Sequence, residues 1–397
     1  MRIVNFVRQT GRAVTADSGE RIGIKTLPAF DGLRGYMAWW VVSAHALQLC
    51  GVRDSWAALL MHGAAAVNVF VCLSGFVITH LLLEKREPYG AYLTRRAFRI
   101  FPIYWFALLV SVLLAGTYEV TYRGAWIAHQ DDLIARADSI RQNFATHVLL
   151  HLPLAHGLIP DTWLRHSSDA LLGPAWSLSL EWQFYIVAPL LVLGLTRSVR
   201  TFFGTLIGLG VAWWFFKKIS PLQWNYPAFL PLSLHFFAIG MLSRVFLPAI
   251  SRAVAWLIPA AVIAAAMAPR SVWLELTIWI VFLCVAASQL REARGQSSGI
   301  GFLAGPLGAL ASNRVIRKLG ECSYSTYLIH VPLLSLSGWM TSRIAGDWTQ
   351  PLCVSSTVIA LVLLVPISTL LYRYLERPCI QAGSRVITPH RPVLRVD

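Results

Sequence analysis

The sequence predicts an all-α integral membrane protein with about ten transmembrane helices, both termini in the cytoplasm and one long external loop. Of its 397 residues, 56% are hydrophobic and only 13% are charged. The apolar residues form runs long enough to cross a hydrocarbon core of about 30 Å. Lys and Arg gather at the ends of these runs, so the net charge of +15 indicates membrane orientation rather than nucleic-acid binding.

The apolar runs define the expected transmembrane segments, with Gly, Pro and charged residues at their ends. They are 36–51, 57–83, 100–116, 174–194, 202–219, 227–248, 253–268, 272–290, 322–340 and 352–375. With the N-terminus inside, most of the 34 Lys and Arg residues fall on the cytoplasmic side, as the positive-inside rule requires. We therefore expect a basic cytoplasmic tail at 1–26, a membrane domain at 27–380 and a cytoplasmic tail at 381–397.

The long external loop is expected at 117–171, between the third and fourth segments, and it holds several Asp and His residues. A loop of this length is usually functional or folded on its own. His147, His151 and Asp161 have a spacing that a zinc site would accept, although loop histidines are usually solvated. The favoured expectation is that the protein binds no metal.

The first segment combines a charged helix mouth with a deep imidazole. Asp31 and Arg34 are spaced so that they can pair across one helical turn. His45 would lie about 16 Å along the helix from Arg34, near the membrane midplane. An ionisable group at that depth indicates a functional site, and a buried neutral histidine bonded to a carbonyl is the alternative.

Polar side chains recur in the later segments. Ser74 and Gly75 are suited to hydrogen bonding and close packing between membrane helices. Arg96 and Arg99 share one helix face, where guanidinium groups can grip phosphates, and membrane anchoring is the alternative. Glu181 is a carboxylate within a span, so it must be paired, protonated or solvated.

The ninth segment carries a polar seam. Ser323, Tyr327 and His330 are spaced by four and three residues, so they lie on one helix face. His235 and Glu275 are also intramembrane polar residues, but neither belongs to a wider polar pattern. We expect both to have structural roles.

The ordered motifs resemble one family over residues 27–380. They are FDGLRG followed by His45, NVFVCLSGF, RRAFRIFPIYW, PAWSLSLEWQFY, CSYSTYLIHVP and YLERP. Together they are similar to the acyltransferase-3 family of bacterial integral membrane O-acyltransferases. The family's usual phenylalanine pair before LSGF is replaced here by Val71 and Cys72, a local departure that bears on the shape of the cavity.

The resemblance implies a ten-helix enzyme of the bacterial inner membrane. Such an enzyme moves an acyl group, commonly acetyl, from cytoplasmic acyl-CoA to a hydroxyl of a carbohydrate. Arg34 and His45 match the family's paired arginine and histidine. Arg96 with Arg99 matches its RxxR motif, and Glu181 matches its acidic position.

These matches give the expected site. The catalytic residues would be His45, Arg34 and Glu181, with His45 as general base and Glu181 orienting it or binding the acceptor. Acetyl-CoA or another acyl-CoA would be the donor. Its binding residues would be Arg34, Ser74, Arg96, Arg99, Tyr327 and His330.

Two matters stay open on the sequence. The acceptor could be a surface polysaccharide, lipopolysaccharide or lipo-oligosaccharide, or instead a small natural product; membrane lipid is a further expected partner, and nucleic acid is not. A transporter or flippase of a lipid-linked sugar would also place Arg, Glu and His at depth in broken helices. The sequence has no visible inverted repeat, which favours the enzyme.

Overall fold

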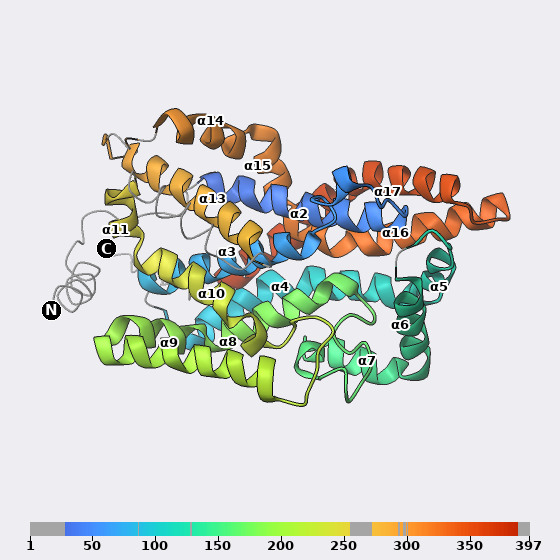
Figure 1. Ribbon diagram of the computed structural model, residues 1–397, viewed down its shortest axis with the longest axis horizontal. Coiled ribbons are helices and arrows are strands. Elements are labelled where there is room, and N and C mark those ends of the chain that lie inside the picture. The colour runs from blue at the N-terminus through green and yellow to red at the C-terminus, as the bar shows by residue number, and fades with distance from the viewer. Residues whose placement is uncertain are drawn as a thin grey trace, which may run out of the picture.

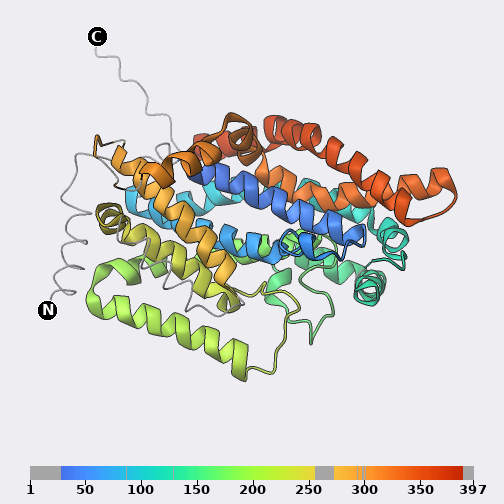
Figure 2. The ribbon, with the colours of Figure 1, turned by 45° about the horizontal axis from the view of Figure 1, so that its top comes forward.

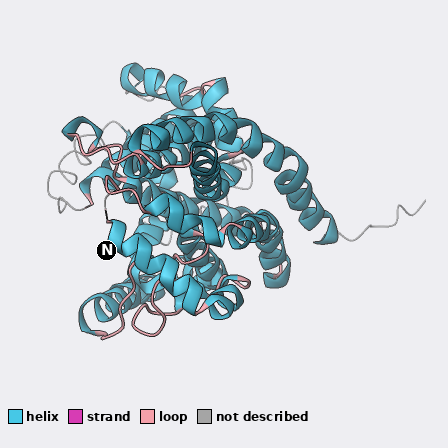
Figure 3. Ribbon diagram, turned by 90° about the vertical axis from the view of Figure 1, so that its right-hand side faces the viewer, coloured by secondary structure: helices cyan, strands magenta, loops and turns pink. Residues whose placement is uncertain are grey.

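The long helices of the protein lie along one direction and form an elongated bundle (Figure 1). The computed structural model describes residues 28–387 except 86, 128, 255–271, 293, 297, 298 and 300. Within this part of the chain, helices are joined by loops and there is no strand (Figure 3). The expected tail 1–26 and nearly all of the expected segment 253–268 lie outside the described residues.

The other expected transmembrane segments coincide with helices. These helices are α2 (Pro28–Leu49), α3 (Gly63–Glu84), α4 (Tyr89–Leu113), α8 (Trp176–Arg197), α9 (Val199–Trp214), α10 (Leu230–Val245), α13 (Trp273–Glu292), α16 (Ser323–Ala345) and α17 (Gln350–Leu371). By length and apolar composition, 6 helical stretches of the described chain can cross a membrane. Neither α2 nor α16 is among them. Both carry polar side chains of the candidate site, which lower their mean hydropathy. The count of about ten transmembrane helices therefore stays a prediction.

The expected external loop is itself helical. It contains α5 (Tyr118–Tyr122), α6 (Gln130–Gln142) and α7 (Phe144–His151), which lie at the right-hand end of the bundle in Figure 1. We call this end the α6 end. Further short helices are α11 (Leu247–Arg252), α14 (Gly301–Ser312), α15 (Arg314–Glu321) and α18 (Arg377–Ile387).

Helix α2 packs against α3, α15 and α16, and in Figure 2 it lies between α3 and α16. Its first turns approach the backbone of neighbouring helices very closely. A Cβ added at Gly32 would lie 1.8 Å from the carbonyl oxygen of Ala311, and one at Gly320 would lie 2.0 Å from that of Asp31. One face of α2 is therefore closed by backbone, while Arg34 faces a cavity between the helices.

A second close contact joins α3 and α10. A Cβ added at Gly75 would lie 2.4 Å from the carbonyl oxygen of Phe237, and one at Gly240 would lie 1.9 Å from that of Cys72. The expectation that Gly75 permits close helix packing is confirmed. This contact fixes the rotation of α3, with Ser74 directed toward α8.

The core between α2, α3 and α13 is aromatic. The ring centroids of Phe30 and Phe76 are 4.8 Å apart, and that of Trp279 is 5.8 Å from Phe30. The indole nitrogen of Trp279 donates to Ser243 Oγ over 3.0 Å, so its buried N–H is satisfied. These large side chains hold α2 in place beside the candidate site.

Candidate active site

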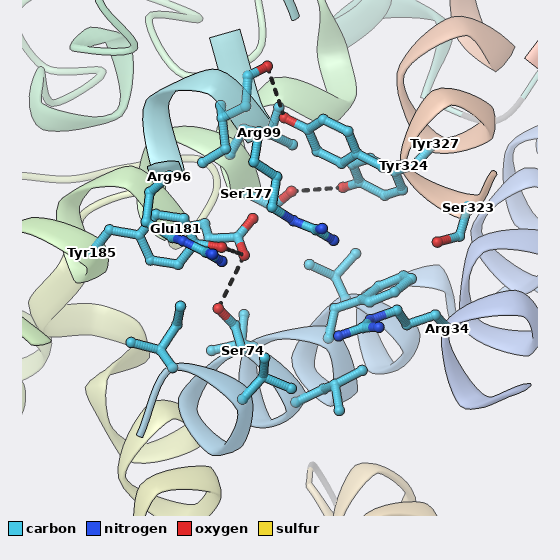
Figure 4. A pocket seen from close by; sticks show the side chains of 18 of the residues that line it. Arg34, Ser74, Arg96, Arg99, Ser177, Glu181, Tyr185, Ser323, Tyr324 and Tyr327 are labelled. Atoms are coloured by element: carbon cyan, nitrogen blue, oxygen red, sulfur yellow. Dashed lines mark hydrogen bonds between the residues drawn. The ribbon is translucent and has the colours of Figure 1, made fainter. Parts of the chain in front are cut away.

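Residues of six helices, α2, α3, α4, α8, α10 and α16, line a cavity of about 300 Å³, which we call the arginine cavity. Arg34 reaches it from α2, and Arg96 and Arg99 reach it from α4 (Figure 4). Its other polar lining residues are Ser74, Ser177, Glu181, Tyr185, Ser323, Tyr324 and Tyr327. The structure thus gathers motifs that are far apart in the sequence around one space.

The arginines leave donor groups free within this cavity. Nη1 of Arg34 pairs with Oδ1 of Asp31 over 3.1 Å, which confirms the expected ion pair across one helical turn. Arg96 lies over the ring of Tyr185 at 5.9 Å, and its buried Nε has no hydrogen-bond partner among the described residues. Guanidinium N–H groups in such a position can bind the oxygens of an anion.

Glu181 is held by hydrogen bonds on the same side of the cavity. Its Oε1 accepts from Ser74 Oγ over 3.0 Å and also accepts from the hydroxyl of Tyr185. The sequence-based idea that Glu181 orients His45 is not met: within the described chain these two hydroxyls are its hydrogen-bond partners. It belongs instead to the arginine cavity, where its negative charge faces the guanidinium groups.

A second cavity of about 540 Å³, which we call the histidine cavity, lies between α2, α3, α16 and the loops near the α6 end. His45 lines it, together with Arg136 and Trp176. Val67 and Tyr327 line both cavities. The two spaces therefore adjoin at these two side chains.

His45 and His330 form a pair whose hydrogen bonds define the tautomers. Nδ1 of His45 is 3.0 Å from the carbonyl oxygen of Val41, and Nδ1 of His330 is 2.8 Å from that of Tyr327. Because a carbonyl only accepts, both Nδ1 atoms carry the proton in the neutral rings. Nε2 of His330, 3.1 Å from Nδ1 of His45, then accepts from it. Nε2 of His45 keeps a free lone pair, as a general base requires.

Most of the expected site residues come together, but not in one place. The arginine cavity holds Arg34, Ser74, Arg96, Arg99, Glu181 and Tyr327. His330, expected among the donor-binding residues, instead contacts His45 beside the histidine cavity. Tyr327 connects the two groups, because its ring lines both cavities and its carbonyl binds His330.

Sequence reasoning missed two residues of α8. Ser177 Oγ is 2.8 Å from the hydroxyl of Tyr327, and Tyr185 donates to Glu181. Both lie four residues from Glu181, on the same helix face. That spacing is a signal in the sequence that would have found them.

Comparison with known proteins identifies the family. The model of the acyltransferase-3 family, described as an acyltransferase domain, matches residues 27–373. The chain belongs to this family. As a member of the acyltransferase-3 family it is an O-acyltransferase. The six helical stretches of the described chain that are long and apolar enough to cross a membrane indicate a multi-pass membrane protein.

Two of the three relatives described below carry acyltransferase or O-acetyltransferase names. Acyltransferase MdmB of Streptomyces mycarofaciens is 26% identical over 408 residues, which cover 92% of this chain and 94% of that protein. Protein 2 in the picA locus of Rhizobium radiobacter is 35% identical over 156 residues, 38% of this chain and 74% of that protein. A putative O-acetyltransferase of Staphylococcus aureus (strain COL) is 24% identical over 184 residues, 45% of this chain and 26% of that protein. No solved structure matches the chain.

Four histidines of the loop region, His147, His151, His156 and His166, are buried and bonded to protein groups. Nε2 of His147 is 3.1 Å from Ser139 Oγ, and the rings of His151 and His156 stack with centroids 4.0 Å apart. Asp161 accepts from a backbone N–H instead of facing them. Across the described residues, no group of three His, Cys, Asp or Glu side chains is arranged to hold a metal ion. The zinc alternative has no support in this arrangement.

These buried histidines predict an acid-labile loop region. Burial lowers the pKa of His147 and that of His156 to about 4, from an ordinary value of 6.5. Between pH 4 and 6.5 the unfolded chain binds more protons at these histidines than the folded chain does. Their contribution to folding stability is therefore complete above about pH 6.5 and is lost as the pH drops toward 4. Across that window each histidine lowers the free energy of unfolding by about 1.4 kcal/mol for every pH unit that the pH falls.

Hydrogen–deuterium exchange of α7 measures this effect. Exchange is expected to be faster at about pH 5 than at about pH 7.5, after correction for the intrinsic rate. Equal corrected exchange at both pH values would contradict the prediction. Helix α9 carries no histidine, so its exchange is the internal control.

Proposed function

We propose that the protein transfers an acyl group, acetyl in the simplest case, from cytoplasmic acyl-CoA to a hydroxyl of a carbohydrate acceptor beyond the membrane. The observation that carries the proposal is the junction of the two cavities. One cavity presents guanidinium groups, the other presents an imidazole with a free Nε2, and Val67 and Tyr327 line both. A donor in the first and an acceptor in the second would meet there.

The connections of the helices support the proposed orientation. Helix α4 leads directly toward α5 at the α6 end, and Trp126 from the same region donates to the carbonyl of Leu49 at the end of α2. Arg34, Arg96 and Arg99 lie in the opposite halves of these helices. We place about ten helices of the protein in the inner membrane, with the α6 end outside and both termini in the cytoplasm. In this orientation the guanidinium groups lie toward the cytoplasm, where acyl-CoA is made.

The donor cavity fits the reactive end of the thioester. Its volume, about 300 Å³, is at the lower limit of ligand sites, so it would take the acyl-pantetheine arm rather than the whole donor. Arg96 and Arg99 would bind phosphate oxygens at the entrance by charge-assisted hydrogen bonds. Glu181, held by Ser74, would set the position of these guanidinium groups.

The transfer step needs a base and a stabilised oxyanion. The acceptor oxygen attacks the thioester carbonyl carbon as its proton passes to Nε2 of His45. The C–O bond forms, the C–S bond breaks, and the proton then goes to the leaving thiolate. The hydroxyl of Tyr327 donates to the carbonyl oxygen of Pro174 over 3.1 Å and lies 2.8 Å from Ser177 Oγ. During transfer it would turn from Pro174 to donate to the thioester carbonyl oxygen as that oxygen gains charge.

Deletion of the gene tests this function. Mass spectrometry of envelope carbohydrates should detect an ester-linked acyl group that is lost in the deletion strain and restored by the wild-type gene. Purified protein should release CoA from acetyl-CoA when given carbohydrate from the deletion strain. An unchanged acylation pattern together with no CoA release would refute the proposal.

A further inference from the structure

Arg136 is a buried cation in the histidine cavity that the proposed transfer does not use. It lies on α6, is 6% exposed, and is the only Lys or Arg among the described residues that line this cavity. Its guanidinium packs over the ring of Tyr118 at 5.6 Å. Burial alone would lower the pKa of Arg136, but the neighbouring Tyr122 and Asp169 outweigh burial and raise it, so the side chain stays charged.

The two edges of this guanidinium have different surroundings. On one edge, Nε donates to the carbonyl oxygen of Ala170 over 3.0 Å and lies 3.8 Å from Asp169 Oδ2. On the other edge, Nη2 is buried and has no hydrogen-bond partner among the described residues. A buried charged donor without a partner is costly, so this edge is suited to a ligand that supplies an acceptor oxygen.

Gly173 lies beside that edge and places no side chain against it. A Cβ added at Gly173 would lie 3.3 Å from Nη1 and 3.4 Å from Nη2 of Arg136. The rings of Trp176 and Tyr226 stack at 5.5 Å and line the same cavity, giving apolar faces beside the charge. His45 and Arg136 line the same cavity.

We propose that the acceptor carries an anionic oxygen group, a carboxylate or a phosphate, which the free edge of Arg136 binds while the reacting hydroxyl lies at His45. The inference rests on the proposed function and adds the chemical class of the acceptor to it. A planar guanidinium fork matches the two oxygens of such a group. Asp132 is the one Asp or Glu among the described lining residues, and it is largely solvent-exposed.

Chemical removal of the anionic group from the natural acceptor tests this directly. Carbohydrate from the deletion strain is divided into an untreated portion, a carboxyl-reduced portion and a dephosphorylated portion. Each is offered to the purified wild-type protein with acetyl-CoA. One treatment should lower the initial rate of transfer about 10- to 100-fold, the range expected for lost hydrogen bonds to a charged group. The effective treatment identifies the group as carboxylate or phosphate.

Each outcome decides a separate question. Equal rates on all three portions would overturn the inference and leave the proposed transferase function standing. Failure to acylate the untreated portion would overturn the proposed function and the inference with it. The wild-type comparison does not depend on whether any variant folds.

A variant pair then tests the residue. Arg136→Gln should lower the rate on untreated acceptor about 10- to 100-fold, toward the rate on the treated acceptor, without raising the KM for acetyl-CoA. Arg141→Gln is the control, because Arg141 lies on the same helix but is exposed and pairs with Glu119. If Arg136→Gln keeps the full preference for untreated acceptor, Arg136 does not bind the anionic group.

Discussion

Replacing His45 with glutamine is expected to lower the initial rate of acyl transfer about 10²–10⁴-fold, the usual contribution of a general base. The carbonyl of Val41 and Nε2 of His330 both face Nδ1 of His45, which leaves Nε2 as the proton acceptor. Glutamine can hydrogen-bond but cannot take a proton at neutral pH. The KM for acetyl-CoA should stay unchanged, because the arginine cavity is intact. Steady-state kinetics on purified protein give both values.

Variants of two further histidines serve as comparisons in this experiment. His330→Gln should lower kcat less than the His45 variant and shift the pH profile of kcat, since His330 acts through its contact with His45. His235→Gln is the matched control: His235 lies on α10 against Trp213, with ring centroids 5.9 Å apart. Activity of His45→Gln within a few-fold of wild type would exclude His45 as the base.

Neutralising the guanidinium groups of α4 is expected to weaken donor binding strongly. Arg96→Gln and Arg99→Gln should each raise the KM for acetyl-CoA about 10- to 100-fold, because each removes charge-assisted hydrogen bonds to phosphate oxygens. Their kcat should change much less, since neither residue lies at the histidine cavity. The KM should also rise with salt in the wild type more steeply than in the variants.

Arg95 provides a control within the same motif. It directly precedes Arg96, but it pairs with Glu87 and does not belong to the lining of the arginine cavity. Arg95→Gln should therefore leave the KM for acetyl-CoA near the wild-type value. An equal rise in KM for Arg95→Gln would indicate a general electrostatic effect rather than a phosphate site.

Local spacing and hydrophobic runs were enough to predict much of the fold. The apolar runs predicted the helices because a membrane segment must satisfy its backbone internally. The three-residue spacing of Asp31 and Arg34 predicted their ion pair, and the sequence around Gly75 predicted close packing. Each of these properties depends on neighbours within one helix or on one small side chain.

Contacts between distant helices were less accessible from the sequence. Depth along a span suggested that Glu181 and His45 could meet, but helix rotation turns Glu181 of α8 toward Ser74 of α3. Rotation is set by packing such as the α3–α10 contact, which no local pattern reports. The sequence did not indicate a site role for Arg136, because this residue lies in a region expected to be a loop. Neither a helix face nor a position relative to the membrane could be assigned to it there.

The arrangement at Val67 and Tyr327 also bears on the energy supply of the cell. A bacterial inner membrane holds a proton gradient, and a continuous water-filled path through an enzyme would discharge it. Here Val67 and Tyr327 line both cavities. In the proposed function, an acyl group passed between the cavities at these side chains would let acyl-CoA on one side modify material on the other without opening a route for ions.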